Sequence, residues 1–78
     1  MNDALKLKVL VVEDELLVRV GIKSSIDWEE NNLMLVGEAA NGQEAVPLLH
    51  TCRPDIVLLD IRLPDISGLD LLRMIRME

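Results

Sequence analysis

The strongest constraint on the fold of this chain is a run of five residues, Lys8–Val12, that is apolar after its first member. The run is rich in β-branched residues, is too short for a helix and lacks the alternation of a half-exposed strand. Such runs are typical of strands that are buried on both faces of a parallel sheet. Leu33–Ala39 and Asp55–Asp60 are also apolar over most of their length, so we expect three strands.

A helix is expected after the first strand. Val18, Ile22 and Ile26 recur at helical spacing and form one apolar stripe. Asp14 stands where it could cap the first turn of this helix. The polar stretch 27–32 then predicts a connector to the second strand.

Two more helices are predicted by their starting residues. Asn41 and Glu44 have the spacing of a capping box, although Pro47 falls inside the helix that would follow. Ser67 is expected to cap a third helix, with Asp70 at its third position. The expected buried face of that helix consists of Leu69, Leu72 and Ile75.

The resulting order is β-α-β-α-β-α. Strands that alternate with helices in this way predict an α/β fold in which a parallel sheet is linked by right-handed crossovers. A chain of 78 residues is expected to form a single domain.

Composition narrows the possible functions. The net charge is −6 and the basic residues are scattered, so nucleic-acid binding by this segment is not expected. No apolar run approaches the roughly 20 residues that span a bilayer, so no membrane insertion is expected. Cys52 is the single cysteine, which with the lack of a signal-peptide pattern predicts a cytoplasmic protein.

Acidic residues follow two of the three predicted strands. Glu13 and Asp14 follow the first, and Asp60 ends the third. Sites in open α/β sheets form at the carboxyl ends of the strands, so these carboxylates would meet if the two strands are neighbours. Crowded carboxylates favour a bound cation, and this ligand set suits Mg²⁺ better than Ca²⁺. The alternative is that Asp14 is only a helix cap and Asp60 only a polar strand end.

Three segments resemble one known family. Val11–Glu15, Gly37–Ala45 and Asp55–Asp70 are similar, in order and spacing, to the receiver domain of bacterial two-component response regulators. The resemblance implies a flavodoxin-like, doubly wound parallel sheet with strand order 2-1-3. Ile26–Glu30 is similar to a subgroup whose members control transcription through an AraC-type DNA-binding domain.

The resemblance also implies residue roles. Asp60 would accept a phosphoryl group from the phosphohistidine of a sensor histidine kinase. Asp14 and Asp60 would bind Mg²⁺ directly, Glu13 would act mainly through water, and the backbone carbonyl of Arg62 would be a further ligand. Such a receiver is a phosphoacceptor, not a turnover enzyme.

The family pattern continues past the third helix, so residues 1–78 are expected to be the N-terminal part of a receiver domain. In the family, a fourth strand ends in Ser or Thr and a fifth in Lys, and both contact the phosphoryl group. Without the fourth strand, Ile56–Leu59 would be an exposed apolar edge. Self-association through this edge, or exchange of elements between copies, is therefore expected.

Two alternatives to a phosphoacceptor remain open. The chain could be a receiver-like interaction fragment that is not phosphorylated. It could also be a hydrolase that uses the acid cluster on a phosphate ester, although a general base is not evident. The lack of a Gly-rich loop after the first strand argues against a nucleotide enzyme.

Overall fold

The computed structural model describes residues 5–77 and follows the predicted order of elements. The elements are β1 (Leu7–Val12), α1 (Leu16–Ser25), β2 (Leu33–Ala39), α2 (Gly42–Cys52), β3 (Ile56–Leu59) and α3 (Gly68–Met77). The three predicted strands are thereby confirmed, with ends within one residue of those expected.

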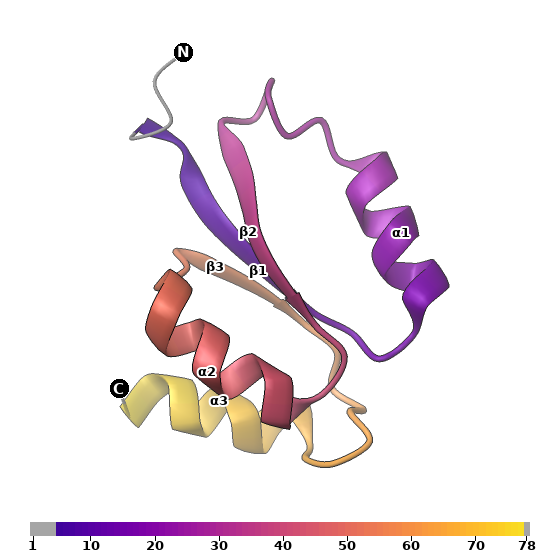
Figure 1. Ribbon diagram of the computed structural model, residues 1–78, viewed down its shortest axis with the longest axis vertical. Coiled ribbons are helices and arrows are strands. Elements are labelled where there is room, and N and C mark those ends of the chain that lie inside the picture. The colour runs from indigo at the N-terminus through magenta and orange to yellow at the C-terminus, as the bar shows by residue number, and fades with distance from the viewer. Residues whose placement is uncertain (1–4, 78) are drawn as a thin grey trace.

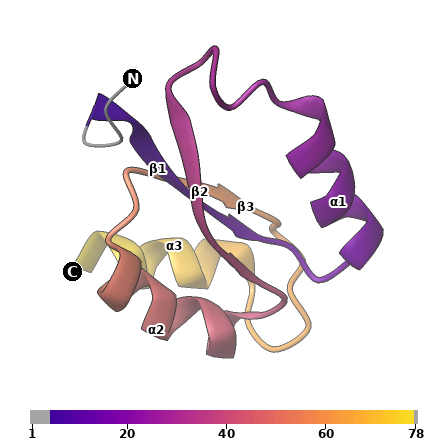
Figure 2. The same cartoon turned by 45° about the horizontal axis from the view of Figure 1, so that its top comes forward.

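The three strands form one parallel sheet in the order β2-β1-β3. Helix α1 covers one face of this sheet, and α2 and α3 cover the other (Figures 1 and 2). This arrangement confirms the flavodoxin-like, doubly wound fold with strand order 2-1-3. Val12 pairs with both Ala39 and Leu59, so all three strands end at the same level.

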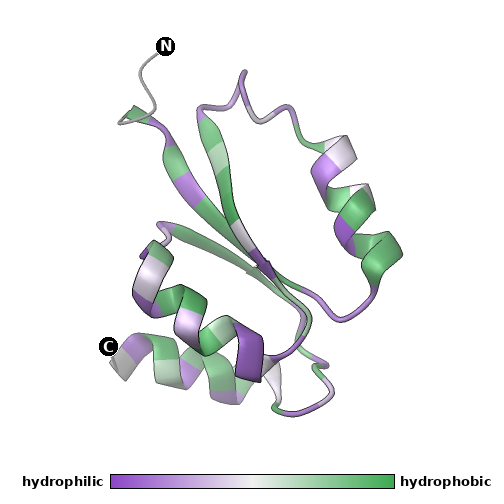
Figure 3. Ribbon diagram, viewed as in Figure 1, coloured by the Kyte–Doolittle hydropathy of each residue, from purple (hydrophilic) through white to green (hydrophobic). Residues whose placement is uncertain are grey.

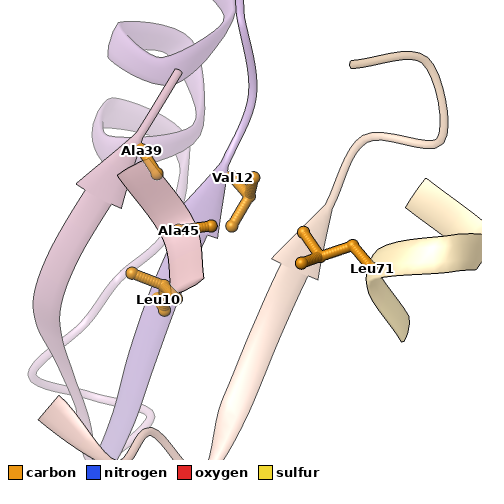
Figure 4. Close-up of a cluster of buried hydrophobic side chains, with 5 residues drawn as sticks. All are labelled: Leu10, Val12, Ala39, Ala45 and Leu71. Carbon is orange, nitrogen blue, oxygen red and sulfur yellow. The ribbon is translucent and has the colours of Figure 1, made fainter. Parts of the chain in front are cut away.

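The core is centred on β1, as its unbroken apolar sequence predicted. Val9, Leu10, Val11 and Val12 are each at most 2% exposed. Successive strand residues point to opposite faces, so a central strand covered on both sides must be apolar at every position. Leu10 and Val12 belong to the cluster drawn in Figure 4, which also contains Ala39, Ala45 and Leu71. The hydropathy of the strands in Figure 3 shows the same concentration of apolar residues in the sheet.

The start of α1 corrects one prediction. The N-cap of this helix is Glu15, so the expectation that Asp14 caps it was wrong. Asp14 lies one residue too early, and its carboxylate instead joins a cluster at the end of the sheet. Ile26 is the C-cap and lies outside the helix, so the apolar stripe within α1 is shorter than expected.

The predicted cap of α2 is confirmed. The side-chain Oδ1 of Asn41 accepts a hydrogen bond from the Glu44 amide at 2.8 Å. The Glu44 carboxylate reaches back to the amide of Ala40, one residue before the cap, also at 2.8 Å. Pro47 is accommodated inside the helix, which ends at Arg53 in the left-handed region, with φ 46°.

The buried face of α3 also differs from the prediction. Ser67 caps this helix as expected, because its Oγ accepts a hydrogen bond from the amide of Asp70 at 3.1 Å. Ile75 packs against the core as expected, but Leu71 is fully buried, whereas Leu69 is 57% and Leu72 is 42% exposed. Apolar residues cover a wide arc of this helix, and only the part of the arc that faces the sheet is buried. Periodicity alone could not identify that part.

Candidate functional site

The acidic residues predicted to meet at the end of the sheet do so. Glu13 directly follows β1 and Asp60 directly follows β3, and the last residues of these two neighbouring strands, Val12 and Leu59, are partners. One carboxylate oxygen from each of Glu13, Asp14 and Asp60 lies within 4.8 Å of the other two.

Main-chain hydrogen bonds hold Glu13 and Asp60, two of the three residues of this acidic cluster, in place. The amide of Asp60 donates to the carbonyl of Val12, and the amide of Glu13 donates to the carbonyl of Ala39, both at 2.9 Å. The hydrogen bonding of the sheet therefore continues one residue past the strands. Glu13 and Asp60 are consequently held by the sheet, and Asp14 follows in the segment that leads to α1.

The environment of Asp60 favours its ionised form. Its Oδ1 accepts a hydrogen bond from the amide of Arg62 at 3.0 Å. This backbone hydrogen bond, followed by hydrogen bonding with Glu13, lowers the pKa of Asp60 below its ordinary value. Asp60 is therefore a carboxylate, the form that can act as a nucleophile, at neutral pH.

The environment of Glu13 has the opposite effect. Partial burial, followed by hydrogen bonding to Asp60 and then to Asp14, raises the pKa of Glu13 above its ordinary value. Glu13 is thus the more readily protonated of the two strand-end residues as the pH falls. A cation beside the cluster would oppose this effect because it stabilises all three negative charges.

The oxygen atoms of the cluster suit a small, hard cation. Mg²⁺ binds oxygen ligands at about 2.0–2.1 Å and is usually held by one or two carboxylates together with water. The three carboxylate oxygens, all within 4.8 Å of one another, are the type of ligand that would hold such an ion. An open hollow of about 380 Å³ lies beside the cluster, and its lining includes Glu13, Asp60 and Ile22.

Two residues that tie neighbouring segments together were not predicted from the sequence. Arg19 of α1 donates a hydrogen bond from Nη1 to the Glu13 carbonyl at 2.6 Å. Asp65, in the loop between β3 and α3, accepts hydrogen bonds from the amides of Gly42 and Gln43 at 2.8 and 2.9 Å. Both contacts join segments that are distant in sequence or lie on different elements, so local patterns carry no signal for them.

The family model for the response regulator receiver domain matches residues 9–78. This chain belongs to that family. The match includes Glu13, Asp14 and Asp60, so the acidic cluster lies wholly within the part of the chain that is similar to receivers.

Individual relatives agree with this assignment. The chain is 44% identical over 70 residues to a protein-glutamate methylesterase/protein-glutamine glutaminase of Pyrococcus horikoshii. The match covers 90% of this chain but 19% of that protein. The chain is 42% identical over 69 residues to the transcriptional regulatory protein YdfI of Bacillus subtilis, covering 88% of this chain and 32% of that protein. The names of these relatives show that similar receivers occur in proteins with different activities.

A solved receiver has the same fold. The receiver domain of AraT, a response regulator from Geobacillus stearothermophilus, superposes with a TM-score of 0.86 at 41% identity. The match covers 91% of this chain and 55% of that chain, so the receiver described here spans about half the length of the solved one. Within residues 5–77, the helices fall short of the length and apolar character that crossing a membrane requires.

Proposed function

We propose that this receiver accepts a phosphoryl group on Asp60 from the phosphohistidine of a sensor histidine kinase. A carboxylate oxygen of Asp60 attacks phosphorus, and the bond between phosphorus and the imidazole nitrogen breaks. The electron pair of that bond returns to the imidazole, which then takes up a proton. The observation that supports this proposal most is the convergence of Glu13, Asp14 and Asp60 within 4.8 Å.

We propose further that Glu13, Asp14, Asp60 and the backbone carbonyl of Arg62 hold Mg²⁺. The bound ion would neutralise charge on the transferring phosphoryl oxygens. The chain's own contribution is to orient the nucleophile, because the amide of Arg62 holds one oxygen of the Asp60 carboxylate. The other oxygen of Asp60 is then available to attack.

The proposed output is control of transcription through a domain outside this chain, in the cytoplasm. Ile26–Glu30 is similar to receivers that precede AraC-type DNA-binding domains. A relative named as a transcriptional regulatory protein is in keeping with this proposal.

Phosphorylation by a small donor tests the assignment of Asp60. Incubation of the chain with acetyl phosphate and Mg²⁺ should add one phosphoryl group, detected by intact-protein mass spectrometry. Asp60→Asn should abolish the addition. Asp70→Asn is the matched control, because Asp70 is an exposed residue on α3 that pairs with Arg73 and lies outside the cluster.

The other outcomes point to the alternatives. Equal labelling of wild type and Asp60→Asn would contradict the assignment. A folded chain that is never labelled would be an interaction fragment instead of a phosphoacceptor. Steady turnover of phosphate esters would indicate a hydrolase.

We also propose that the outer edge of β3 pairs with a second copy of the chain. Within residues 5–77, β3 is hydrogen-bonded to β1 alone, so its other edge presents unpaired backbone groups. An apolar hollow of about 540 Å³ adjoins this edge, lined in part by Val57, Leu59, Leu69 and Leu72. Pairing of two such edges would cover both the backbone groups and the apolar surface.

Light scattering coupled to size-exclusion chromatography tests this pairing. The wild-type chain should elute as a dimer or larger species. Leu72→Glu should shift the chain toward monomer, because it places a charge in the hollow. A wild-type chain that is a stable, cooperatively unfolding monomer would refute the proposal.

A further inference from the structure

Arg19 connects helix α1 to the end of the central strand. It lies in the first turn of α1, and its side chain is 16% exposed. Its guanidinium donates from Nη1 to the main-chain carbonyl of Glu13 at 2.6 Å. That carbonyl stands past the last residue of β1, beside the acidic cluster.

A second strand holds the same guanidinium. Nε of Arg19 lies 3.5 Å from Oε1 of Glu38, a residue of β2 whose side chain is 31% exposed. The other oxygen of Glu38 pairs with Nζ of Lys23, one helical turn after Arg19, at 3.1 Å. The planar fork of Arg19 can therefore contact the residue that follows β1 and a residue of β2 at the same time, which a single ammonium group could not do as well.

These contacts fix the peptide that joins Glu13 to Asp14. The amide of Glu13 is bound to Ala39 of β2, and its carbonyl is bound to Arg19. With both groups bound, rotation about the backbone bonds of Glu13 is restricted. The directions in which the Glu13 and Asp14 side chains leave the backbone depend on that rotation.

We propose that Arg19 is a positioning residue for the acidic cluster: its guanidinium, held by Glu38, orients the Glu13–Asp14 peptide so that both carboxylates face Asp60. The inference rests on the proposed metal-binding function of this cluster and adds a residue to it. Arg19 itself is not a ligand, because it is a cation.

The direction in which Mg²⁺ affinity changes when Arg19 is replaced distinguishes a positioning role from a simple effect of its charge. A positive charge near the cluster repels Mg²⁺, so its removal should tighten Mg²⁺ binding if charge were its only effect. If Arg19 orients the ligands, its removal should weaken binding despite the lost repulsion. Removal of a partner that orients metal ligands typically costs about 10–100-fold in metal affinity.

The experiment compares Arg19→Gln with Lys23→Gln in the 78-residue chain. Both substitutions remove one positive charge from the same helix and the same Glu38 carboxylate, but only Arg19 contacts Glu13. Mg²⁺ affinity is measured by isothermal titration calorimetry, and folding is checked by circular dichroism. We expect about a tenfold loss for Arg19→Gln and unchanged or slightly tighter binding for Lys23→Gln.

Three results would overturn the proposal. The first is wild-type or tighter Mg²⁺ binding by Arg19→Gln. The second is an equal loss in Lys23→Gln, which would indicate a general effect on the helix. If Arg19→Gln does not fold, Arg19→Lys is measured in its place, and a smaller loss of Mg²⁺ affinity is expected. The third refuting result is an unchanged Mg²⁺ affinity of Arg19→Lys.

A metal-free measurement keeps this inference separate from the proposed function. If the wild-type chain does not bind Mg²⁺, the proposed metal site fails. The positioning role is then judged from the NMR shift of the Glu13 carbonyl carbon, which reports its hydrogen bond. That shift should change in Arg19→Gln and not in Lys23→Gln, and an unchanged shift in both would overturn the inference.

Discussion

Gly68 begins α3 and packs directly against the backbone that carries Asp60. Its amide donates to the carbonyl of Ile61 at 2.7 Å. A Cβ atom at this position would lie 2.5 Å from the carbonyl oxygen of Asp60 and 2.6 Å from the Cα of Ile61. These are backbone atoms, so they cannot rotate away as a side chain would. We therefore predict that Gly68→Ala destabilises the chain and displaces the backbone at Asp60.

The expected size of this effect follows from two opposing terms. Overpacking of a tight site costs about 1–3 kcal/mol. Alanine in place of glycine in a helix offsets about 0.5–1 kcal/mol of that cost. The difference between these terms is a net loss of about 0–2.5 kcal/mol in the free energy of unfolding, with a central value of about 1 kcal/mol. For a domain of this size, each 1 kcal/mol lowers the melting temperature by about 4–8 °C.

Gly21→Ala is the matched control for Gly68→Ala. Gly21 lies within α1, and no heavy atom of the described chain that could obstruct an added Cβ lies within 4 Å. The same change should therefore stabilise the chain there by about 0.5–1 kcal/mol. Both variants are melted at one protein concentration and followed by circular dichroism, because the proposed self-association would make the midpoint concentration-dependent. A Gly68→Ala variant as stable as Gly21→Ala would refute the reasoning.

Three further predictions concern other parts of the structure. Hydrogen bonds from the amides at the start of α2 lower the pKa of Asp65, so the stability it contributes is present above its ordinary value of 3.8 and is lost as the pH falls through the folded value. The melting temperature should therefore fall less steeply with decreasing pH in Asp65→Asn than in wild type. Equal slopes would contradict a stabilising role for the hydrogen bonds of Asp65 to α2. Pro47 is exposed and interrupts the hydrogen bonds of α2, so Pro47→Ala should raise the free energy of unfolding in urea by up to about 3 kcal/mol. A lower free energy of unfolding would show that the proline makes stabilising contacts. Asp60→Asn should bring the raised pKa of Glu13 closer to its ordinary value in a carboxyl-carbon NMR titration, and a further rise would contradict the proposed coupling.

Much of the fold could be predicted from local sequence. The apolar run of β1 predicted a strand buried on both faces, and Val9, Leu10, Val11 and Val12 are each at most 2% exposed. The cap at Asn41 was predicted because a capping box involves residues only three apart. The buried face of α3 was predicted only in part: Ile75 packs against the core, but Leu71 is buried in place of Leu69 and Leu72.

The candidate site also has features that the sequence predicted and features that it did not. Its three acidic residues could be identified because strand ends are recognisable and parallel strands end at one edge of the sheet. The helix cap assigned to Asp14 was wrong because the chain turns one residue later, at Glu15. Arg19 was not predicted, because its contacts with Glu13 and Glu38 require α1 to fold back over the strands that carry them.

The sequence by itself determined which residues form strands, the order of strands and helices, and the acidic residues at the strand ends. Hydrophobic periodicity and capping act over a few residues, so a linear pattern records them. Only the tertiary structure decided that the three carboxylates lie within 4.8 Å, that Asp65 ties its loop to α2, and that Arg19 reaches Glu13. These contacts depend on the packing of helices against a twisted sheet, which brings together residues whose positions along the chain are unrelated.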